Sequence, residues 1–340
     1  MAVAEPAASV TPVVTQADVE RRGRAFGLEV LSAYEIPALE IPAPARGGPA
    51  ASLRSTVCRE QGAAELEHAW PTEGVEPLVE LRFPDGRPFL SVSRHREQGY
   101  RIWAPRHGRH VVSPDGREIR SALPRSAAAA WQRLFFAQTL PLAAALQGLE
   151  LLHASAVGLG GRAIAFTAAA GTGKSSLAAH LLATGATFLT DDVLALELGG
   201  DGVLAHPGPA RASVFSYELR SMTNEGRARL GRRVAAADKP QFEPSRASSA
   251  LPLAILYRIS RSPRFARLGL HEQVPAEPMA VLASSFLTYL RTRERLLNQL
   301  AVCDRLTRSV RVYDLEIPAS VSAQATAAFV RAHSEGVLAE

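Results

Sequence analysis

Six residues, Gly171 to Ser176, limit most strongly what this chain can fold into. Their sequence is Gly-Thr-Gly-Lys-Ser-Ser, and they lie between a short apolar stretch at 163–166 and a helical pattern at 175–183. Glycines allow the backbone N–H groups of such a loop to turn inward around phosphate oxygens, and the first turn of the following helix adds partial positive charge. The segment therefore predicts a strand, a phosphate-binding loop and a helix in direct succession.

Two side chains of this loop have predicted roles toward a nucleoside triphosphate. Lys174 reaches the β- and γ-phosphates, and the Ser175 hydroxyl ligates Mg²⁺. Ala168 takes the place of the first glycine of the G-x-x-x-x-G-K-[ST] pattern, which is tolerated if its φ angle is negative. A turn followed by an ordinary helix start is the alternative. The residues expected to contact the nucleotide are Ala170, Gly171, Thr172, Gly173, Lys174, Ser175 and Ser176.

Lysine is nearly absent from the chain, which makes the remaining lysines informative. Of 38 basic residues, only Lys174 and Lys239 are lysines, and the rest are arginines. A compact ammonium group and a planar guanidinium are not interchangeable, so a lysine that persists against this bias is a candidate for a chemical role. We expect Lys239 to contact a phosphate or the acceptor. An exposed lysine retained by chance is the alternative.

Two carboxylates follow the next predicted strand, at 186–190. Asp191 and Asp192 lie one strand–helix–strand unit after the phosphate loop, where one carboxylate usually holds the metal. Because neighbouring side chains at a strand end point to opposite faces, we assign Asp191 to Mg²⁺ and Asp192 to the acceptor hydroxyl as general base. In the alternative, Asp192 only caps or turns the chain.

A histidine lies on a predicted strand before the phosphate loop, in the sequence Leu-Leu-His-Ala-Ser-Ala-Val. A lone histidine among apolar residues is more often a packed core residue than a catalyst. Here, a strand–turn–strand pattern at 157–163 brings His153 beside the strand that leads into the loop. We therefore expect it near the nucleotide, as a candidate catalytic residue together with Lys174 and Asp192.

Three pieces, His-Ala-Ser-Ala-Val, Ala-Gly-Thr-Gly-Lys-Ser-Ser-Leu and Gly-Ala-Thr-Phe-Leu-Thr-Asp-Asp-Val, together resemble the catalytic domain of the HPr kinase/phosphorylase family. The resemblance is close over these pieces and loose over residues 151–335. It implies an α/β phosphate-loop domain akin to that of phosphoenolpyruvate carboxykinase, with ATP and Mg²⁺ as cofactors. It also implies that His153 assists near the transferred phosphate, that Asp192 accepts the proton, and that Ser175 and Asp191 lie at the metal.

The region after the carboxylate pair departs from that family. Members that phosphorylate the phosphocarrier HPr have a Glu-x-Arg-Gly signature there, and the corresponding residues 206–212 lack the Glu and the Arg-Gly. The chain looks more like divergent members, some of which phosphorylate a serine on ribosomally made peptides such as lasso-peptide precursors. The resemblance thus implies a serine kinase of a peptide pathway.

The chain is long enough for two domains. Residues 1–125 form a predicted β-rich N-terminal domain, in which strand patterns and two Pro-Asp-Gly turns indicate a small antiparallel sheet. Residues 126–150 form a linking helix with a bend expected at Pro141. In residues 151–340, alternating strands and helices predict a sheet covered by helices on both faces. Further strands are expected there at 251–259 and 310–317, a mostly helical segment at 280–300 and a final helix at 322–333.

Composition indicates the class of protein and its cellular location. With 47% hydrophobic and 21% charged residues, the chain can bury a core. Residues 1–20 have no basic residue and no long apolar run, so a secretory signal is not expected, and no apolar stretch in the sequence is long enough for a membrane span. With only two cysteines, we expect a cytoplasmic protein without membrane contact. The segment 40–50, rich in proline, glycine and alanine, is a predicted linker or loop.

Charge indicates which partners to expect. The net charge of +5 is spread along the chain without a block of like charges, so nucleic-acid binding is not expected. The arginine-rich segment 291–295 is an expected solvated face, with docking of an acidic peptide as the alternative. A peptide or protein substrate is expected, and the sequence leaves homo-oligomerisation open.

These features predict a kinase that transfers the γ-phosphoryl group of ATP to a hydroxyl, with a serine of a peptide or protein as the leading acceptor. A kinase for a small-molecule hydroxyl would differ only in its acceptor pocket. A nucleotide-gated binding module, in which the N-terminal domain recognises a partner, is the non-enzymatic alternative. His153 and Asp192 favour chemistry, since a switch needs neither.

Overall fold

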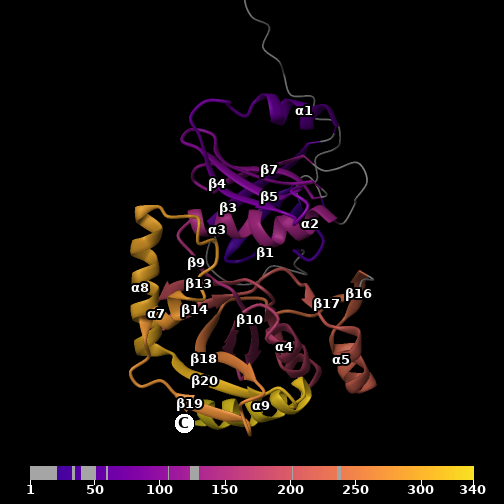
Figure 1. Cartoon of the computed structure of the whole chain (residues 1–340), viewed down its shortest axis with the longest axis vertical. Helices are drawn as coiled ribbons and strands as arrows, with labels where there is room; N and C mark the ends of the chain where they lie inside the picture. The colour runs from indigo at the N-terminus through magenta and orange to yellow at the C-terminus, as the bar shows by residue number, and fades with distance from the viewer. Residues whose placement is uncertain are drawn as a thin grey trace, which may run out of the picture.

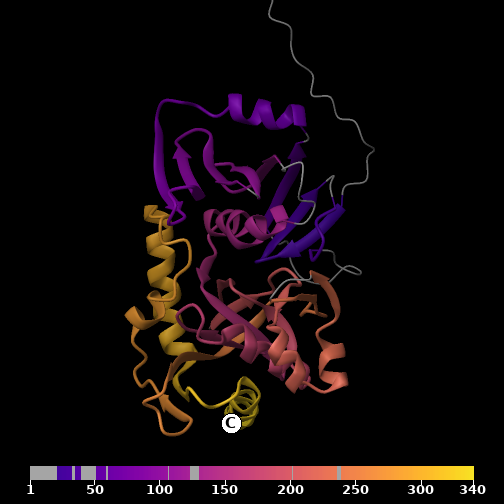
Figure 2. The ribbon, with the colours of Figure 1, turned by 45° about the vertical axis from the view of Figure 1, so that its right-hand side comes forward.

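The computed structural model describes residues 21–32, 35–39, 51–58, 60–105, 107–122, 130–200, 202–235 and 239–340. Two large β-sheets lie one above the other along the long axis of the molecule, with a helical segment between them (Figure 1, Figure 2). The predicted loop at 40–50 and the segment 1–20 lie outside the described residues. The fold is mixed α/β.

The upper sheet, here called the N-terminal sheet, has eight strands in the order β1-β2-β3-β8-β7-β6-β5-β4. Their bounds are β1 (Arg21–Ala25), β2 (Leu28–Ser32), β3 (Ala51–Cys58), β4 (Val75–Arg82), β5 (Pro88–His95), β6 (Gly99–Ala104), β7 (Gly108–Val112) and β8 (Glu118–Ala122), with helix α1 (Glu60–His68) after β3. Strands β4 to β8 form an antiparallel meander. Strand β3, however, pairs in parallel with both β2 and β8. The prediction of a small antiparallel sheet is therefore correct for the meander and wrong for the whole sheet, because hairpin signals do not report pairing between remote strands.

The connecting segment is helical but not uniform. It consists of α2 (Ala130–Leu134), the wider π-helical turn η1 (Phe135–Thr139) and α3 (Leu140–Leu146). The helix continues through Pro141, and the irregularity lies just before it. Proline cannot donate a backbone hydrogen bond to the preceding turn, which the wider turn accommodates.

The lower sheet, here called the C-terminal sheet, contains nine strands in a mixed arrangement. Strand β18 pairs in parallel with β11 on one side and β20 on the other, whereas β10 and β11 form an antiparallel hairpin. The bounds are β9 (Glu150–Leu152), β10 (Ala154–Leu159), β11 (Arg162–Thr167), β12 (Thr187–Thr190), β13 (Leu194–Gly199), β14 (Gly202–His206), β18 (Leu251–Ser262), β19 (Gly269–Glu272) and β20 (Arg311–Pro318). A separate three-stranded sheet consists of β15 (Ala212–Ser213), β17 (Gln241–Glu243) and β16 (Arg232–Ala235).

Helices cover both faces of the C-terminal sheet, as predicted. On one face, α4 (Lys174–Ala183) and α9 (Ala323–Ala339) pack against Ile164 and Phe166 of β11. On the other face, α8 (Arg293–Ser309) packs against Ala163 and Ala165 of the same strand. The remaining helices are α5 (Ser216–Ser221), α6 (Asn224–Arg229) and α7 (Pro278–Leu282).

The predicted strands at 251–259 and 310–317 and the predicted final helix are confirmed by β18, β20 and α9. The segment 280–300, predicted to be mostly helical, is helical only at its two ends. Helix α7 ends at Leu282, and α8 begins only at Arg293, after Thr292 caps it by accepting a hydrogen bond from the Arg295 N–H. The segment 283–292 between these helices lies beside β9, since the His153 N–H donates to Ser284 O and the Phe286 N–H donates to Leu151 O.

The two sheets share a hydrophobic core. Side chains of the N-terminal sheet, of α2 to α3, of β9 and β13, and of residues 287–290 pack in one buried cluster. Backbone hydrogen bonds reinforce the contact, since Phe26 N–H donates to Pro207 O over 2.7 Å and Ala210 N–H donates to Ala38 O over 2.9 Å. The N-terminal sheet is thus fixed against the region that carries the phosphate loop.

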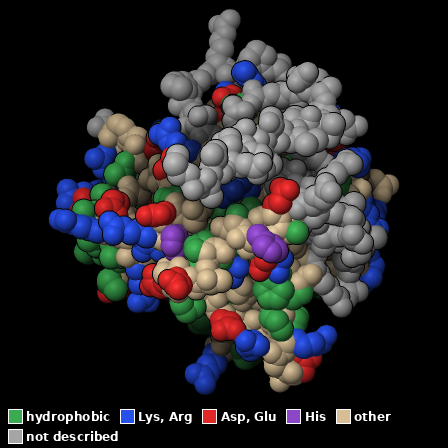
Figure 3. Space-filling view, turned by 90° about the horizontal axis from the view of Figure 1, so that it is seen from above, with side chains coloured by type: hydrophobic (Ala, Val, Ile, Leu, Met, Phe, Trp, Pro, Cys, Tyr) green, Lys and Arg blue, Asp and Glu red, His purple; other side chains and the backbone are tan. Residues whose placement is uncertain are grey.

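Two further observations concern the surface. Of the helices in the described ranges, none combines the length and the apolar composition that crossing a bilayer requires. Seen from above, the described surface carries Lys and Arg side chains interspersed with Asp and Glu side chains (Figure 3).

Candidate active site

The predicted phosphate-binding loop, here called the phosphate loop, comprises residues 168–174. It follows β11, and its last residue, Lys174, is also the first residue of α4. Gly171 and Gly173 have φ angles of 80° and 111°, in the left-handed region that side chains disfavour. A Cβ atom added at either position would meet no atom of a remote residue within 4 Å, so these glycines are required by their backbone conformation and not by close packing. Ala168 is not among the four non-glycine residues with positive φ in the described chain, which meets the condition for alanine at the first glycine position.

Lys174 lies within the loop and is only 5% exposed. Its Nζ donates to the carbonyl oxygens of Ala168, over 2.8 Å, and Ala169, over 3.4 Å. Burial lowers the pKa of Lys174, and the carboxylates of Asp192 and Asp191 oppose this shift. A buried cation whose nearest partners are neutral carbonyl groups is suited to an incoming anion.

Both lysines of the chain lie at this loop. Lys239 Nζ donates to Ser175 Oγ over 3.4 Å and lies 5.3 Å from the centre of the Phe215 ring. Phe215 stacks on Tyr217 with ring centres 5.4 Å apart, and both rings are substantially exposed. The structure therefore brings Lys239 to Ser175, beside an exposed aromatic pair.

Asp191 follows β12 and is held by three hydrogen bonds. Its Oδ1 accepts from Ser155 Oγ over 2.7 Å and from the Asp192 N–H over 3.1 Å, and its Oδ2 accepts from the Ser213 N–H over 3.2 Å. Ser155 belongs to β10 and Ser213 to β15. Because its three partners come from three segments, the Asp191 carboxylate has a fixed orientation.

Asp192 is held differently from its neighbour. Its backbone is left-handed, with φ of 69°, and its side chain is exposed and has no hydrogen-bond partner within the described residues. The Asp191 carboxylate, and after it partial burial, raise the pKa of Asp192 to about 6, against the opposing effect of Lys239, Lys174 and Arg133. The expectation that strand alternation separates the two carboxylates is wrong, because β12 ends at Thr190 and Asp192 lies in a turn. The positive φ of Asp192, not the strand pleat, sets its backbone apart.

His153 lies between β9 and β10, not on a strand as predicted, because the two strands pair with different neighbours. The β10–β11 hairpin that was expected to bring it toward the loop is present. His153 Nδ1 lies 3.0 Å from the Asp192 carbonyl oxygen and donates to it, which leaves Nε2 as an acceptor in the neutral ring. Burial, followed by the charge of Lys174, lowers the pKa of His153, so the ring is neutral at pH 7.

Several residues at the site were not identified from the sequence. Ser155 lies within the His-Ala-Ser-Ala-Val motif. A serine between two alanines on a predicted strand was the available signal, and the structure shows that its hydroxyl is fully buried. Phe286, which stacks on His153 with ring centres 6.1 Å apart, comes from the segment between α7 and α8. Arg133, whose charge acts on Asp192, comes from α2. For Phe286 and Arg133, only the tertiary fold reveals the contact.

The donor set fits a Mg²⁺ ion that is held mainly by a nucleotide. No group of three or more His, Cys, Asp or Glu side chains within the described ranges is arranged to hold a metal on its own. Mg²⁺ typically takes one or two carboxylates, together with waters and substrate phosphates. The oriented Asp191 carboxylate and the Ser175 hydroxyl at the phosphate loop are such a partial set.

Comparisons with known proteins identify no family for the chain. No family model matches it, and no curated protein matches it. Among solved structures, it is similar to the Hpr(Ser) kinase/phosphatase from Coxiella burnetii, with 12% sequence identity and a TM-score of 0.31 over 55% of this chain and 97% of that chain.

Proposed function

We propose that the protein is an ATP-dependent kinase that transfers the γ-phosphoryl group to a hydroxyl, with serine of a peptide or protein as the acceptor. The observation that carries the proposal is the position of Asp192, a carboxylate with a raised pKa, beside the cations of a phosphate loop. A site that pairs triphosphate recognition with a proton acceptor fits phosphoryl transfer.

The proposed nucleotide contacts follow from the loop. Backbone N–H groups around Gly171 and Gly173, whose φ angles are positive, would bind phosphate oxygens. Lys174 and Lys239 would neutralise the β- and γ-phosphates, Lys174 from within the loop and Lys239 from beside Ser175. Asp191 and Ser175 would hold Mg²⁺, which neutralises charge on the phosphates when bound. The residues thus supply positioning and charge, the two main contributions to phosphoryl transfer.

Asp192 is the proposed general base. As the acceptor oxygen forms its bond to the γ-phosphorus, the bond to the bridging oxygen of ADP breaks, and the hydroxyl proton moves to the Asp192 carboxylate. With a pKa of about 6, Asp192 is ionised at neutral pH and yet more basic than an ordinary aspartate. Its side chain is exposed, so an acceptor can approach it.

His153 has a narrower proposed role than direct charge stabilisation. A ring that is neutral at pH 7 adds no positive charge beside the phosphates. Its hydrogen bond to the Asp192 carbonyl oxygen makes it a positioning residue for the segment 190–193, here called the carboxylate turn. Its Nε2 can accept a further hydrogen bond. We therefore expect His153 to assist near the transferred phosphate by holding Asp192 in place.

Two alternatives differ in what they require of this site. A small-molecule hydroxyl kinase would use the same residues with another acceptor pocket. A nucleotide-gated binding module would need the loop. It would not need an exposed carboxylate with a raised pKa, such as that of Asp192. That carboxylate is the reason for preferring an enzyme.

The test is incubation of the purified chain with γ-labelled ATP, Mg²⁺ and the peptides or proteins encoded by neighbouring genes. We expect label on a serine with wild-type protein and little label with Asp192→Asn. In parallel, millimolar MgATP should raise the Tm of the wild-type protein. A Tm that does not respond to MgATP would rule out the nucleotide site, and a normal response without transfer to any acceptor would favour the binding module.

A further inference from the structure

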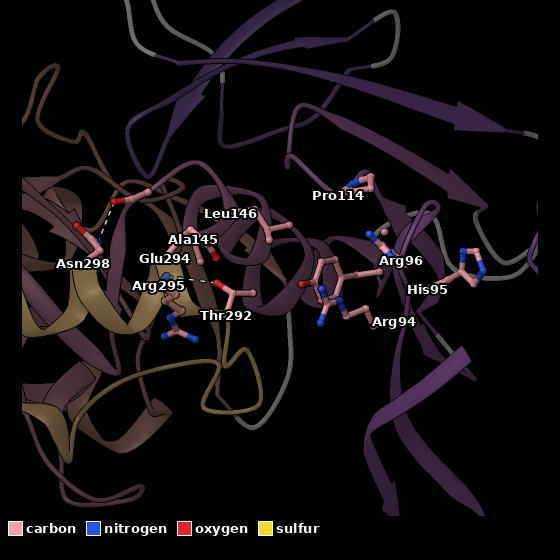
Figure 4. Close-up of a pocket in the computed structure, with 13 residues that line it drawn as sticks. Arg94, His95, Arg96, Pro114, Ala145, Leu146, Thr292, Glu294, Arg295 and Asn298 are labelled. Carbon is pink, nitrogen blue, oxygen red and sulfur yellow. Dashed lines mark hydrogen bonds between the residues drawn. The ribbon is translucent and has the colours of Figure 1, made fainter. Parts of the chain in front are cut away.

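A second candidate site lies where the N-terminal sheet meets α8 (Figure 4). It is a cavity of 330 Å³, lined by the β5–β6 hairpin, the end of α3 and the first turns of α8. Ligand sites typically enclose about 300–1,000 Å³, so this volume suits a small ligand or a short chain segment. Neither the phosphate loop nor the carboxylate turn lines it.

The charged lining of this pocket is mostly basic. Arg94 and Arg96 line the side formed by the hairpin (Figure 4). Arg96 has no hydrogen-bond or ion-pair partner in the part of the chain that the structure describes. Arg94 lies over the Tyr100 ring, 5.9 Å from its centre, and has an exposed ion pair with Glu76 at 4.0 Å. Exposed pairs of that length contribute little. Against these two guanidinium groups, the pocket has a single carboxylate, that of Glu294.

A third arginine, Arg295, belongs to the wall and is already satisfied. Its guanidinium pairs with the fully buried Glu150 at 3.4 Å and donates to the carbonyl oxygens of Phe286 and Leu287. It therefore offers no free charge to a ligand. Its hydrogen bond to the Phe286 carbonyl oxygen does fix the segment that carries Phe286. The Phe286 ring stacks on His153, which bonds to Asp192, so Arg295 connects the pocket wall to the carboxylate turn.

The rest of the lining is partly polar and partly apolar. Its polar side chains are His95, Thr292 and Asn298. Leu146 and Ala145 line the pocket from α3, Pro114 from the turn after β7, and the Tyr100 ring from β6. Tyr100 is only 3% exposed, and its hydroxyl has no hydrogen-bond partner within the described residues. A complementary ligand would thus present an anionic group to Arg94 and Arg96 and an aliphatic group to the apolar part of the lining.

We propose that this pocket binds an acidic peptide segment, with a Glu or Asp side chain against Arg94 and Arg96 and a neighbouring aliphatic side chain against Leu146 and Pro114. Guanidinium groups bind carboxylates with charge-assisted, often bidentate hydrogen bonds, which favours this class of ligand. The inference goes beyond the proposed kinase activity, since binding at the pocket requires no phosphoryl transfer. If the kinase proposal also holds, the segment belongs to the acceptor, anchored away from the carboxylate turn.

The test is fluorescence anisotropy with a fluorescein-labelled peptide of alternating Glu and Leu, in the absence of nucleotide, with the Gln–Leu peptide as reference. We expect the acidic peptide to bind the full-length protein, and the double variant Arg94→Gln/Arg96→Gln to weaken binding by roughly tenfold or more. The matched control is Arg87→Gln/Arg308→Gln, which removes the same charge. These two exposed arginines pair with Asp85 and Asp304, and neither lines the pocket. Equal weakening by both double variants would show non-specific attraction and overturn the proposal.

Two further measurements sharpen this test. Glu294→Gln removes the opposing carboxylate and should strengthen binding about two- to threefold at low salt. Glutarate serves as a small competitor without a peptide chain. Failure of the acidic peptide to bind overturns the proposal, as does glutarate that binds more tightly than the peptide. A Tm shift with MgATP, measured on the same samples, reports the nucleotide site separately, so failure of one proposal is distinguishable from failure of the other.

Discussion

The phosphate loop and the carboxylate turn, residues 190–193, face the same site but are held by different kinds of contact. The loop is contiguous, and its conformation depends on its own glycines and on the bonds from Lys174 to its carbonyl groups. The turn depends on partners far along the chain, including Ser155 and His153. Substitutions in the loop should therefore remove a group that binds the nucleotide. Substitutions of the partners around the turn should instead change the orientation of the Asp191 and Asp192 carboxylates.

The largest effect is expected within the loop. Lys174→Ala removes the only cation inside it and should abolish both phosphoryl transfer and the rise in Tm with MgATP. The fold should survive, because the hydrogen bonds of the Lys174 side chain join it only to carbonyl groups of the loop itself. Ser175→Ala should also abolish transfer. The matched control is Lys239→Ala, which removes the same charge from outside the loop and should weaken transfer without abolishing it. A wild-type response to MgATP in Lys174→Ala would contradict the assigned role of the loop.

In the carboxylate turn, the two neighbouring aspartates should respond differently. Asp192→Asn should leave MgATP binding nearly intact, because asparagine tolerates the left-handed backbone, while transfer falls by roughly 10²- to 10⁴-fold. Asp191→Asn should raise the Mg²⁺ concentration needed for half-maximal binding. Mg²⁺ titration with single-turnover transfer separates the two. If Asp192→Asn transfers phosphate at the wild-type rate, it is not the base, and the nucleotide switch becomes the better interpretation.

The raised pKa of Asp192 also fixes the sign of two pH effects. Transfer should fall as the pH drops through about 6, because the base becomes protonated. The folded state holds this proton more tightly than the unfolded chain, so ionisation of Asp192 costs stability as the pH rises through about 6. The Tm of Asp192→Asn should therefore exceed that of wild type at about pH 8, with a smaller difference at about pH 5. A difference that grows toward acid pH would contradict the shift.

This contrast also explains what the sequence could predict. The loop between β11 and α4 was located from six consecutive residues, because strand, glycine turn and helix start are all local signals. The aspartate pair was located, but strand alternation does not apply to it, because β12 ends at Thr190. Its conformation instead involves remote partners: Ser155 and Ser213 bond to Asp191, and His153 bonds to the carbonyl oxygen of Asp192. The pairing of β3 with β8 was missed because the two strands are also far apart in the sequence. Long-range contacts leave little trace in a single sequence.

A smaller effect is expected from the residue that orients Asp191. Ser155 is fully buried, and Ser155→Ala removes its hydrogen bond to Asp191 Oδ1. We expect a loss of about 1–2 kcal/mol in the free energy of unfolding and a modest rise in the Mg²⁺ requirement. Ser213→Ala is a close control, because Ser213 contacts Asp191 through its backbone N–H, which the substitution retains. Equal effects of the two variants on the Mg²⁺ requirement would show that the Ser155 hydroxyl does not orient the carboxylate.

The smallest effect is expected from Arg133, the contribution of α2 to the site. Its charge lowers the pKa of Asp192, by less than the charge of Lys239 does. Arg133→Gln should therefore move the acid limb of the pH–rate profile slightly upward, and Lys239→Gln should move it further in the same direction. Both shifts should shrink at about 1 M salt, where exposed charges are screened. Arg308→Gln on α8, which also removes an exposed arginine, should leave the profile unchanged. A larger shift from Arg133→Gln than from Lys239→Gln would mean that Arg133 lies closer to the Asp192 carboxylate than Lys239 does. Helix α2, between the two sheets, would then take part in the chemistry.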